Sequence, residues 1–210
     1  MADTPVDTSR YVAFEGAEGA GKSSVVRRVA AHLERSGEDA VVVREPGGTA
    51  VGEAVRDILL SGELEPLPRS EAALFAAARG QLVAEVVIPA LARGAWVLSD
   101  RSAYSSLAYQ AGGRGLPMED VRMMNDFAIG GVWPGTVFLL RVDHATGLRR
   151  QAVGDRIGNE TDLFHADVTR TFDLLARDNP ESFVIIDASQ SIDAVCDEVI
   201  EVVEHLRGGP

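Results

Sequence analysis

The sequence contains almost no lysine. Of its 20 lysine and arginine residues, Lys22 is the only lysine and the rest are arginines. Acidic residues number 32, so the formal net charge is -12 at pH 7. This charge argues against a polyanionic partner such as DNA or RNA, which binds a basic face. It leaves open a small anionic ligand that is held in a local basic pocket.

Cysteine is as scarce as lysine, and long apolar runs are absent. The single cysteine, Cys196, excludes an intramolecular disulfide, and its helical surroundings "DAVCDEVIEVVEHL" predict a buried thiol. No basic segment followed by an apolar core opens the chain, and no apolar run reaches 18 residues. We therefore expect a cytoplasmic protein with no membrane partner. The 210 residues suit one domain, over 11–210, after a flexible tail over 1–10.

Short apolar segments alternate with longer amphipathic ones along the chain. The predicted strands are "YVAFE", "AVVVRE", "AWVLSD", "GTVFLLRVD" and "FVIIDAS". The predicted helices are "KSSVVRRVAAHLERSG", "GEAVRDILLSG", a long stretch that bends or ends near Pro89, "SSLAYQ", "MEDVRMMNDFAIGG", "TDLFHADVTRTFDLLARDN" and 192–206. This alternation predicts an α/β fold, a doubly wound five-stranded parallel sheet with helices on both faces. Ligands of such sheets bind beyond the carboxyl ends of the strands.

A phosphate-binding loop follows the first predicted strand. Gly16, Gly21, Lys22 and Ser23 fit the pattern G-x-x-x-x-G-K-[ST], between a strand and a helix. Glycines let backbone N–H groups surround a phosphate chain, and a serine hydroxyl can bind Mg²⁺. Lysine is a compact charge on a flexible stem, whereas arginine is a wide planar fork, which explains the one retained lysine. The loop predicts ATP with Mg²⁺, held by Gly16, Gly19, Gly21, Lys22, Ser23 and Ser24.

Further motifs in order make the chain resemble the thymidylate kinases, P-loop nucleoside monophosphate kinases that phosphorylate dTMP with ATP. These motifs are "FEGAEGAGKSS", "REPGGT", "LFAAAR", "LSDRSAYSSLAYQ", "GRGL" and "DRI…E" before a long helix. The resemblance spans about 11–206. It implies a homodimer and the reaction of ATP with dTMP to give ADP and dTDP.

The resemblance also implies roles for individual residues. It puts Glu18 near the reacting centre, Arg101 on the acceptor phosphate, and Asp100 beside the metal and its water. The implied acceptor site comprises Glu45, Pro46, Phe75, Arg79, Arg101, Ser106, Tyr109 and Gln110. Within it, Phe75 stacks on the thymine ring, Arg79 binds the base edge, and Tyr109 packs on the deoxyribose.

A short lid, about 149–160, completes the implied site. The loop "GAGK" carries no arginine, so the resemblance leaves Arg149, Arg150 and Arg156 of the lid to act with Lys22, Glu18 and Arg101 in catalysis. Phosphoryl transfer depends on such positive charge and on in-line placement of the reactants.

Two alternatives stay open at this stage. The resemblance breaks at Ser102, where the family usually has an aromatic residue or histidine, and the lid is short. The acceptor is therefore either dTMP or another deoxypyrimidine monophosphate, whether modified or not. From a different class, a non-catalytic nucleotide-binding module would keep the loop without turnover. A GTPase is disfavoured because an N-K-x-D motif needs a second lysine.

Overall fold

The protein is built on a five-stranded parallel sheet with the strand order β2-β3-β1-β4-β5. A computed structural model describes residues 5–142, 146–147, 150 and 156–208. The strands are β1 (Tyr11–Glu15), β2 (Ala40–Arg44), β3 (Trp96–Asp100), β4 (Thr136–Arg141) and β5 (Phe183–Asp187). The predicted sheet and its parallel topology are thus confirmed. The chain adds strands first on one side of β1 and then on the other, so the loop after β1 lies at the topological switch point.

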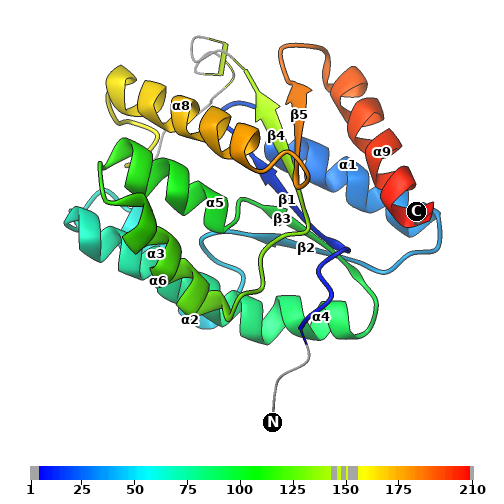
Figure 1. Ribbon diagram of the computed structural model, residues 1–210, viewed down its shortest axis with the longest axis horizontal. Coiled ribbons are helices and arrows are strands. Elements are labelled where there is room, and N and C mark those ends of the chain that lie inside the picture. Colours follow the sequence, from blue (N-terminus) through cyan, green and yellow to red (C-terminus); the bar gives the residue numbers. More distant parts are fainter. Residues whose placement is uncertain (1–4, 143–145, 148–149, 151–155, 209–210) are drawn as a thin grey trace.

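Helices cover both faces of the sheet (Figure 1). On one face lie α1 (Lys22–Arg35) and α9 (Ile192–Gly208). The other face carries α2 (Ala50–Leu60), α3 (Pro68–Leu82), α4 (Ile88–Ala92), α5 (Ala103–Ser106), α6 (Met118–Ile129) and α8 (Asp162–Asp178). Two π-helical segments, η1 (Val83–Val87) and η2 (Leu107–Gly113), continue α3 and α5. The predicted bend near Pro89 corresponds to η1, because proline supplies no N–H to the preceding turn.

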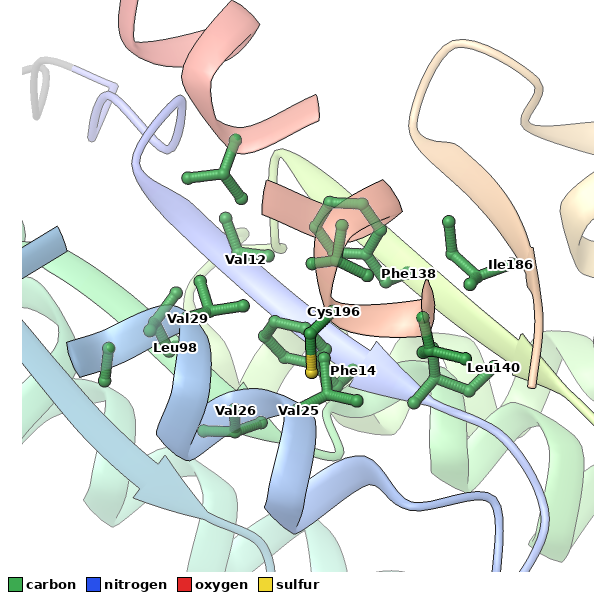
Figure 2. Packing of buried hydrophobic residues seen from close by; sticks show 14 of the residues in the cluster. Val12, Phe14, Val25, Val26, Val29, Leu98, Phe138, Leu140, Ile186 and Cys196 are labelled. Carbon is green, nitrogen blue, oxygen red and sulfur yellow. The ribbon is translucent and has the colours of Figure 1, made fainter. Parts of the chain in front are cut away.

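The core beneath α1 and α9 is continuous and apolar. Figure 2 shows Phe14 and Phe138 of the sheet between these helices, and their rings stack at a centroid distance of 5.4 Å. Cys196 of α9 is 2% exposed within the same cluster, so the predicted buried thiol is confirmed. This packing anchors α1, whose first turn forms part of the phosphate loop.

One helical stretch, Pro68–Ala92, is long and apolar enough to cross a membrane by length and composition. Core helices of soluble proteins pass the same test. Here Glu71 and Arg79 lie within the stretch, both buried and both paired with side chains of this chain. The pairing of these charges with other parts of the fold is typical of a core helix.

The segment before β1 makes contacts with the domain. Arg10 Nη1 donates to Glu38 Oε2 and to the Gly94 carbonyl at 2.8 Å, and its guanidinium lies 5.4 Å from the centroid of the Trp96 ring. The end of the predicted N-terminal tail is therefore attached to the amino-terminal edge of the sheet.

Candidate functional site

The phosphate loop leaves β1 and enters α1 through backbone conformations that glycine adopts readily and other residues rarely adopt. Gly21 occupies the N-cap of α1 with φ 90°, in the left-handed region. Gly16 has φ 136°, and a Cβ atom there would lie 2.4 Å from the carbonyl oxygen of Leu140. Both positions therefore require glycine, and the loop turns its backbone toward the start of a helix, where anions bind.

Lys22 lies within this loop and is 8% exposed. Its Nζ donates hydrogen bonds to the carbonyl oxygens of Gly16 at 2.9 Å and Ala17 at 2.8 Å. Burial, together with the nearby Arg101 guanidinium, lowers the pKa of Lys22 to about 8. An anion at this loop would favour the charged ammonium form of Lys22.

Arg101 follows β3 directly and joins the phosphate loop. Because Phe14 of β1 pairs with Asp100 of β3, the two loops leave the sheet side by side. The Nη2 of Arg101 lies 2.8 Å from Oε1 of Glu18, and its guanidinium lies 4.9 Å from the centroid of the Tyr109 ring. Arg101 has φ 76°, which is rare for a residue other than glycine and is typical of functional sites.

Glu18 accepts a second donor, the hydroxyl of Tyr109, at 2.8 Å from Oε1. Burial by itself would raise the pKa of Glu18, but Arg101, Lys22 and the Tyr109 hydroxyl together lower it. Glu18 is therefore ionised at neutral pH and holds both Arg101 and Tyr109 in place.

Ser23 and Asp100 form the group that could hold a metal ion. The Ser23 hydroxyl donates to Asp100 Oδ2 at 2.5 Å, and both residues line the cavity described below. A hydroxyl beside a carboxylate is a donor set that suits Mg²⁺ when phosphate oxygens complete the shell. Within the described ranges, no three His, Cys, Asp or Glu residues gather as a separate metal site.

These side chains meet in one cavity of about 310 Å³ at the carboxyl edge of the sheet. Twelve of the predicted site residues line it: Glu18, Gly19, Lys22, Ser23, Glu45, Pro46, Phe75, Asp100, Arg101, Ser106, Tyr109 and Gln110. The lining combines the phosphate loop with an aromatic ring and an amide. Such a cavity can hold an anionic group at Lys22 and Arg101 and a flat ring at Phe75.

Ser102, which breaks the family pattern, faces the protein interior. Its hydroxyl donates to Oε1 of Glu15 at 2.7 Å, and the Ser105 hydroxyl donates to Oε2 at 2.6 Å. Glu15 is fully buried, and burial raises its pKa. Ser105 also accepts a bond from Arg101 Nη1 at 3.3 Å, so the buried carboxylate supports the cavity wall that carries Arg101.

Arg79 lies behind the cavity wall, although its α3 neighbour Phe75 lines the cavity. It is 3% exposed and pairs with Glu45 through Nε. Its Nη1 donates to Ser106 Oγ at 3.0 Å and to Asn125, and its Nη2 donates to the Ser102 carbonyl at 3.0 Å. Four of its five N–H groups therefore have partners in the protein. The base-edge contact predicted for Arg79 remains a prediction.

The lid arginines are directed to two different places. Arg150 Nη1 donates to the Ala188 carbonyl at 2.8 Å, beyond the end of β5. Arg156 Nε donates to the Leu59 carbonyl at 2.8 Å, and its Nη2 donates to Glu71 Oε2 at 2.6 Å. Neither residue lines the cavity, and Arg149 lies outside the described residues. Gly16, Gly21 and Ser24 also lie off the lining, in the loop beneath it.

The cavity includes residues that the sequence analysis did not select: Arg44, Arg56, Leu60, Ser105 and Ile157. Arg56 Nη1 donates to the Pro46 carbonyl at 2.8 Å, which brings a second helix to the acceptor side. Arg44 could have been found, because it is the first residue of the motif "REPGGT" that also supplies Glu45 and Pro46. Arg56 and Leu60 belong to an amphipathic helix whose sequence carries no separate signal.

Comparisons with known proteins give one family. The family model described as thymidylate kinase matches residues 14–199. A thymidylate kinase of Bifidobacterium longum is 46% identical over 201 residues, covering 93% of this chain and 98% of the relative. A thymidylate kinase of Caldanaerobacter subterraneus subsp. tengcongensis is 40% identical over 202 residues, covering 95% and 97%. The crystal structure of thymidylate kinase from Ehrlichia chaffeensis aligns with a TM-score of 0.79 at 29% identity, over 94% of this chain and all of that chain.

Proposed function

The chain belongs to the thymidylate kinase family, and we propose that it transfers the γ-phosphoryl group of ATP to dTMP, giving ADP and dTDP. The observation that carries the proposal is the single cavity in which Lys22 and Ser23 of the phosphate loop meet Arg101 and Phe75. Phosphoryl transfer needs two phosphate groups in line with positive charge around them. One cavity that contains both a donor loop and an acceptor arginine meets this need.

On the donor side, the phosphates of ATP lie in the loop from Gly16 to Ser24. Lys22 exchanges its bonds to the Gly16 and Ala17 carbonyls for bonds to phosphate oxygens. Ser23 would hold Mg²⁺ and Asp100 would hold it through water, and the ion would supply positive charge to the phosphate oxygens when it is bound. The 2.5 Å hydrogen bond between these two side chains supports this assignment, because it places both metal-binding oxygen atoms side by side.

On the acceptor side, Arg101 binds the phosphate of dTMP. Among the described residues, its Nη1 makes long contacts, 3.3 Å to Ser105 Oγ and 3.5 Å to the Gly16 carbonyl, so it can turn to a phosphate oxygen. Phe75 stacks on the thymine ring, and Tyr109 packs on the deoxyribose. Glu45, Pro46, Ser106 and Gln110 complete the acceptor pocket, with Arg79 behind it.

The lid, about 149–160, closes over the phosphates during the reaction. In the structure Arg150 and Arg156 are held by Ala188, Leu59 and Glu71, away from the cavity. Closure therefore requires at least one of these contacts to be exchanged for a contact with phosphate. Exclusion of water by a lid prevents hydrolysis of ATP, which is the unproductive alternative to transfer.

The protein acts as a homodimer in the cytoplasm, where ATP and dTMP are present. Support for a self-contact comes from α6, where Met123 is 57% exposed and Phe127 is 91% exposed one helical turn later. Large apolar side chains exposed on adjacent turns are typical of surfaces that pack against another protein. We propose that the partner of this face is a second copy of this chain.

The proposal is tested by measuring ADP release with ATP, Mg²⁺ and a panel of acceptors: dTMP, dUMP, dCMP, UMP and 5-substituted deoxyuridine monophosphates. We expect dTMP to have the highest kcat/KM. A clear preference for a different deoxypyrimidine monophosphate would replace the acceptor in the proposal. ATP binding without turnover of any acceptor would overturn it in favour of a nucleotide-binding module.

A further inference from the structure

Glu71 is a buried carboxylate at the start of α3 that the proposed reaction does not use. Its side chain is 1% exposed, and it accepts hydrogen bonds from three residues in two parts of the chain, the end of η2 and the segment after residue 155. Arg114 donates from Nε at 3.1 Å and from Nη2 at 3.0 Å, and Arg156 donates from Nη2 at 2.6 Å. The remaining donor is Nε2 of Gln110, at 3.0 Å from Oε1. Glu71 thus links the cavity residue Gln110 to two guanidinium groups.

Glu71 is ionised, because two arginines surround it. Burial alone would raise its pKa, but the hydrogen bonds from Arg114, Arg156 and Gln110 lower it. An ionised carboxylate can only accept hydrogen bonds. The group that Gln110 presents to Glu71 must therefore be its NH₂, whichever way the amide would otherwise turn.

The orientation of Gln110 decides which of its atoms remains for a ligand. With Nε2 bound to Glu71, the carbonyl oxygen Oε1 is the other end of a planar amide, and Gln110 lines the cavity. No residue in the described part of the chain donates a hydrogen bond to this oxygen. The oxygen is also not one of the fully buried side-chain atoms that lack a hydrogen-bond partner. Gln110 consequently has its carbonyl oxygen, a hydrogen-bond acceptor, left for a ligand, while its NH₂ group is held by Glu71.

We propose that Glu71 is a positioning residue for base selectivity, because it fixes Gln110 with its carbonyl oxygen toward the N3 position of the acceptor base. Thymine and uracil carry an N–H at N3, which this oxygen accepts. Cytosine has a bare lone pair at N3, which would face the oxygen as a second acceptor. A buried site that is built for an N–H group strongly rejects an analogue that lacks it. The inference rests on the proposed acceptor site and adds the reason for its preference among pyrimidines.

The test replaces Glu71 by an amide of the same shape. In Glu71→Gln the new side chain can donate as well as accept, so Gln110 is free to turn its NH₂ toward the base. We expect the ratio of kcat/KM for dCMP to that for dTMP to rise at least about tenfold, mainly through KM, with the KM for ATP unchanged. Glu71→Asp keeps an acceptor-only carboxylate and should keep the wild-type ratio.

The matched control is Glu160→Gln. Glu160 lies 2.5 Å from Nη1 of the same Arg114 but does not contact Gln110, so loss of its charge should leave the ratio unchanged. Circular dichroism and melting temperatures verify that each variant is folded. A folded Glu71→Gln variant with the wild-type ratio would overturn the proposal.

A second variant keeps the test decisive if Glu71→Gln does not fold. Gln110→Leu keeps the buried volume and leaves Glu71 paired with Arg114 and Arg156, but it removes the acceptor oxygen. We expect the same rise in the dCMP to dTMP ratio, and an unchanged ratio would refute the role of Glu71 through Gln110. Absence of dTMP turnover in the wild-type protein would instead overturn the proposed function. The series therefore separates a failure of this inference from a failure of the proposed function.

Discussion

Arg101 and Glu18 form an ion pair with 2.8 Å between Nη2 and Oε1, and both side chains line the cavity that contains the phosphate loop. The ion pair holds the Arg101 guanidinium over the ring of Tyr109. The backbone of Arg101 has a positive φ. An acceptor phosphate that binds Arg101 therefore meets a guanidinium that is already oriented. The acceptor phosphate also enters near Lys22, and the nearby Arg101 guanidinium disfavours the charged form of Lys22.

Replacement of Arg101 by alanine should impair use of the acceptor and leave ATP binding largely intact. The guanidinium is proposed to hold the acceptor phosphate, so we expect kcat/KM for dTMP to fall roughly 10³-fold or more. Steady-state kinetics and calorimetric titration with ATP measure the two effects separately. Arg27→Ala, on the exposed face of α1, is the matched control. A collapse of ATP binding in Arg101→Ala would contradict the assigned role.

ATP affinity should fall as the pH rises through about 8. Burial and Arg101 lower the pKa of Lys22 to about 8 in the free protein, and bound phosphates favour the ammonium and raise it again. Above pH 8 binding must then take up a proton, so affinity is full below this pH and weakens about tenfold per unit above it.

Calorimetry in two buffers of different ionisation enthalpy measures this proton uptake. We expect uptake of about 0.9 proton per ATP at pH 9, about a quarter of a proton at pH 7.5, and none at either pH in Lys22→Met. An affinity that stays constant from pH 7.5 to 9.5 would show that Lys22 is not the group that is linked to ATP binding.

Removal of charge at Asp100 should raise the Mg²⁺ concentration that the reaction requires. Asp100→Asn keeps the shape of the side chain but weakens its hold on a metal-bound water, so we expect the Mg²⁺ needed for half-maximal rate to increase about 10–100-fold. Asp39→Asn, which alters an exposed pair with Arg93, is the control. Equal Mg²⁺ dependence of wild type and Asp100→Asn would exclude Asp100 from the metal site.

A charge on the exposed face of α6 should dissociate the proposed dimer. We expect light scattering to report a dimer for the wild type at micromolar concentration and a monomer for Phe127→Asp, because a buried unpaired carboxylate opposes association. Leu174→Asp, at an exposed position of α8, should remain dimeric. A wild type that is monomeric under these conditions would refute the assignment.

The sequence predicted much of the fold because local patterns carried it. Apolar strands, helix periodicity and the glycine pattern around Lys22 are readable within a few residues, and they located Lys22, Ser23, Asp100 and Arg101 at one edge of the sheet. The pairs that depend on long-range contacts were not readable. Glu71 meets Arg156 from 85 residues away, and Arg79 meets Asn125 from 46 residues away. Helix spacing put Arg79 near Phe75 but could not show that its guanidinium points behind the cavity.

The most direct test of the central claim is a crystal structure with a bisubstrate nucleotide in which adenosine and thymidine are joined through their phosphates. We predict that the donor phosphates lie in the loop around Lys22, that Arg101 contacts the acceptor phosphate, and that thymine stacks on Phe75 with N3 toward Gln110. A thymine ring bound away from Phe75 and Gln110, or donor phosphates bound outside the loop, would contradict the account.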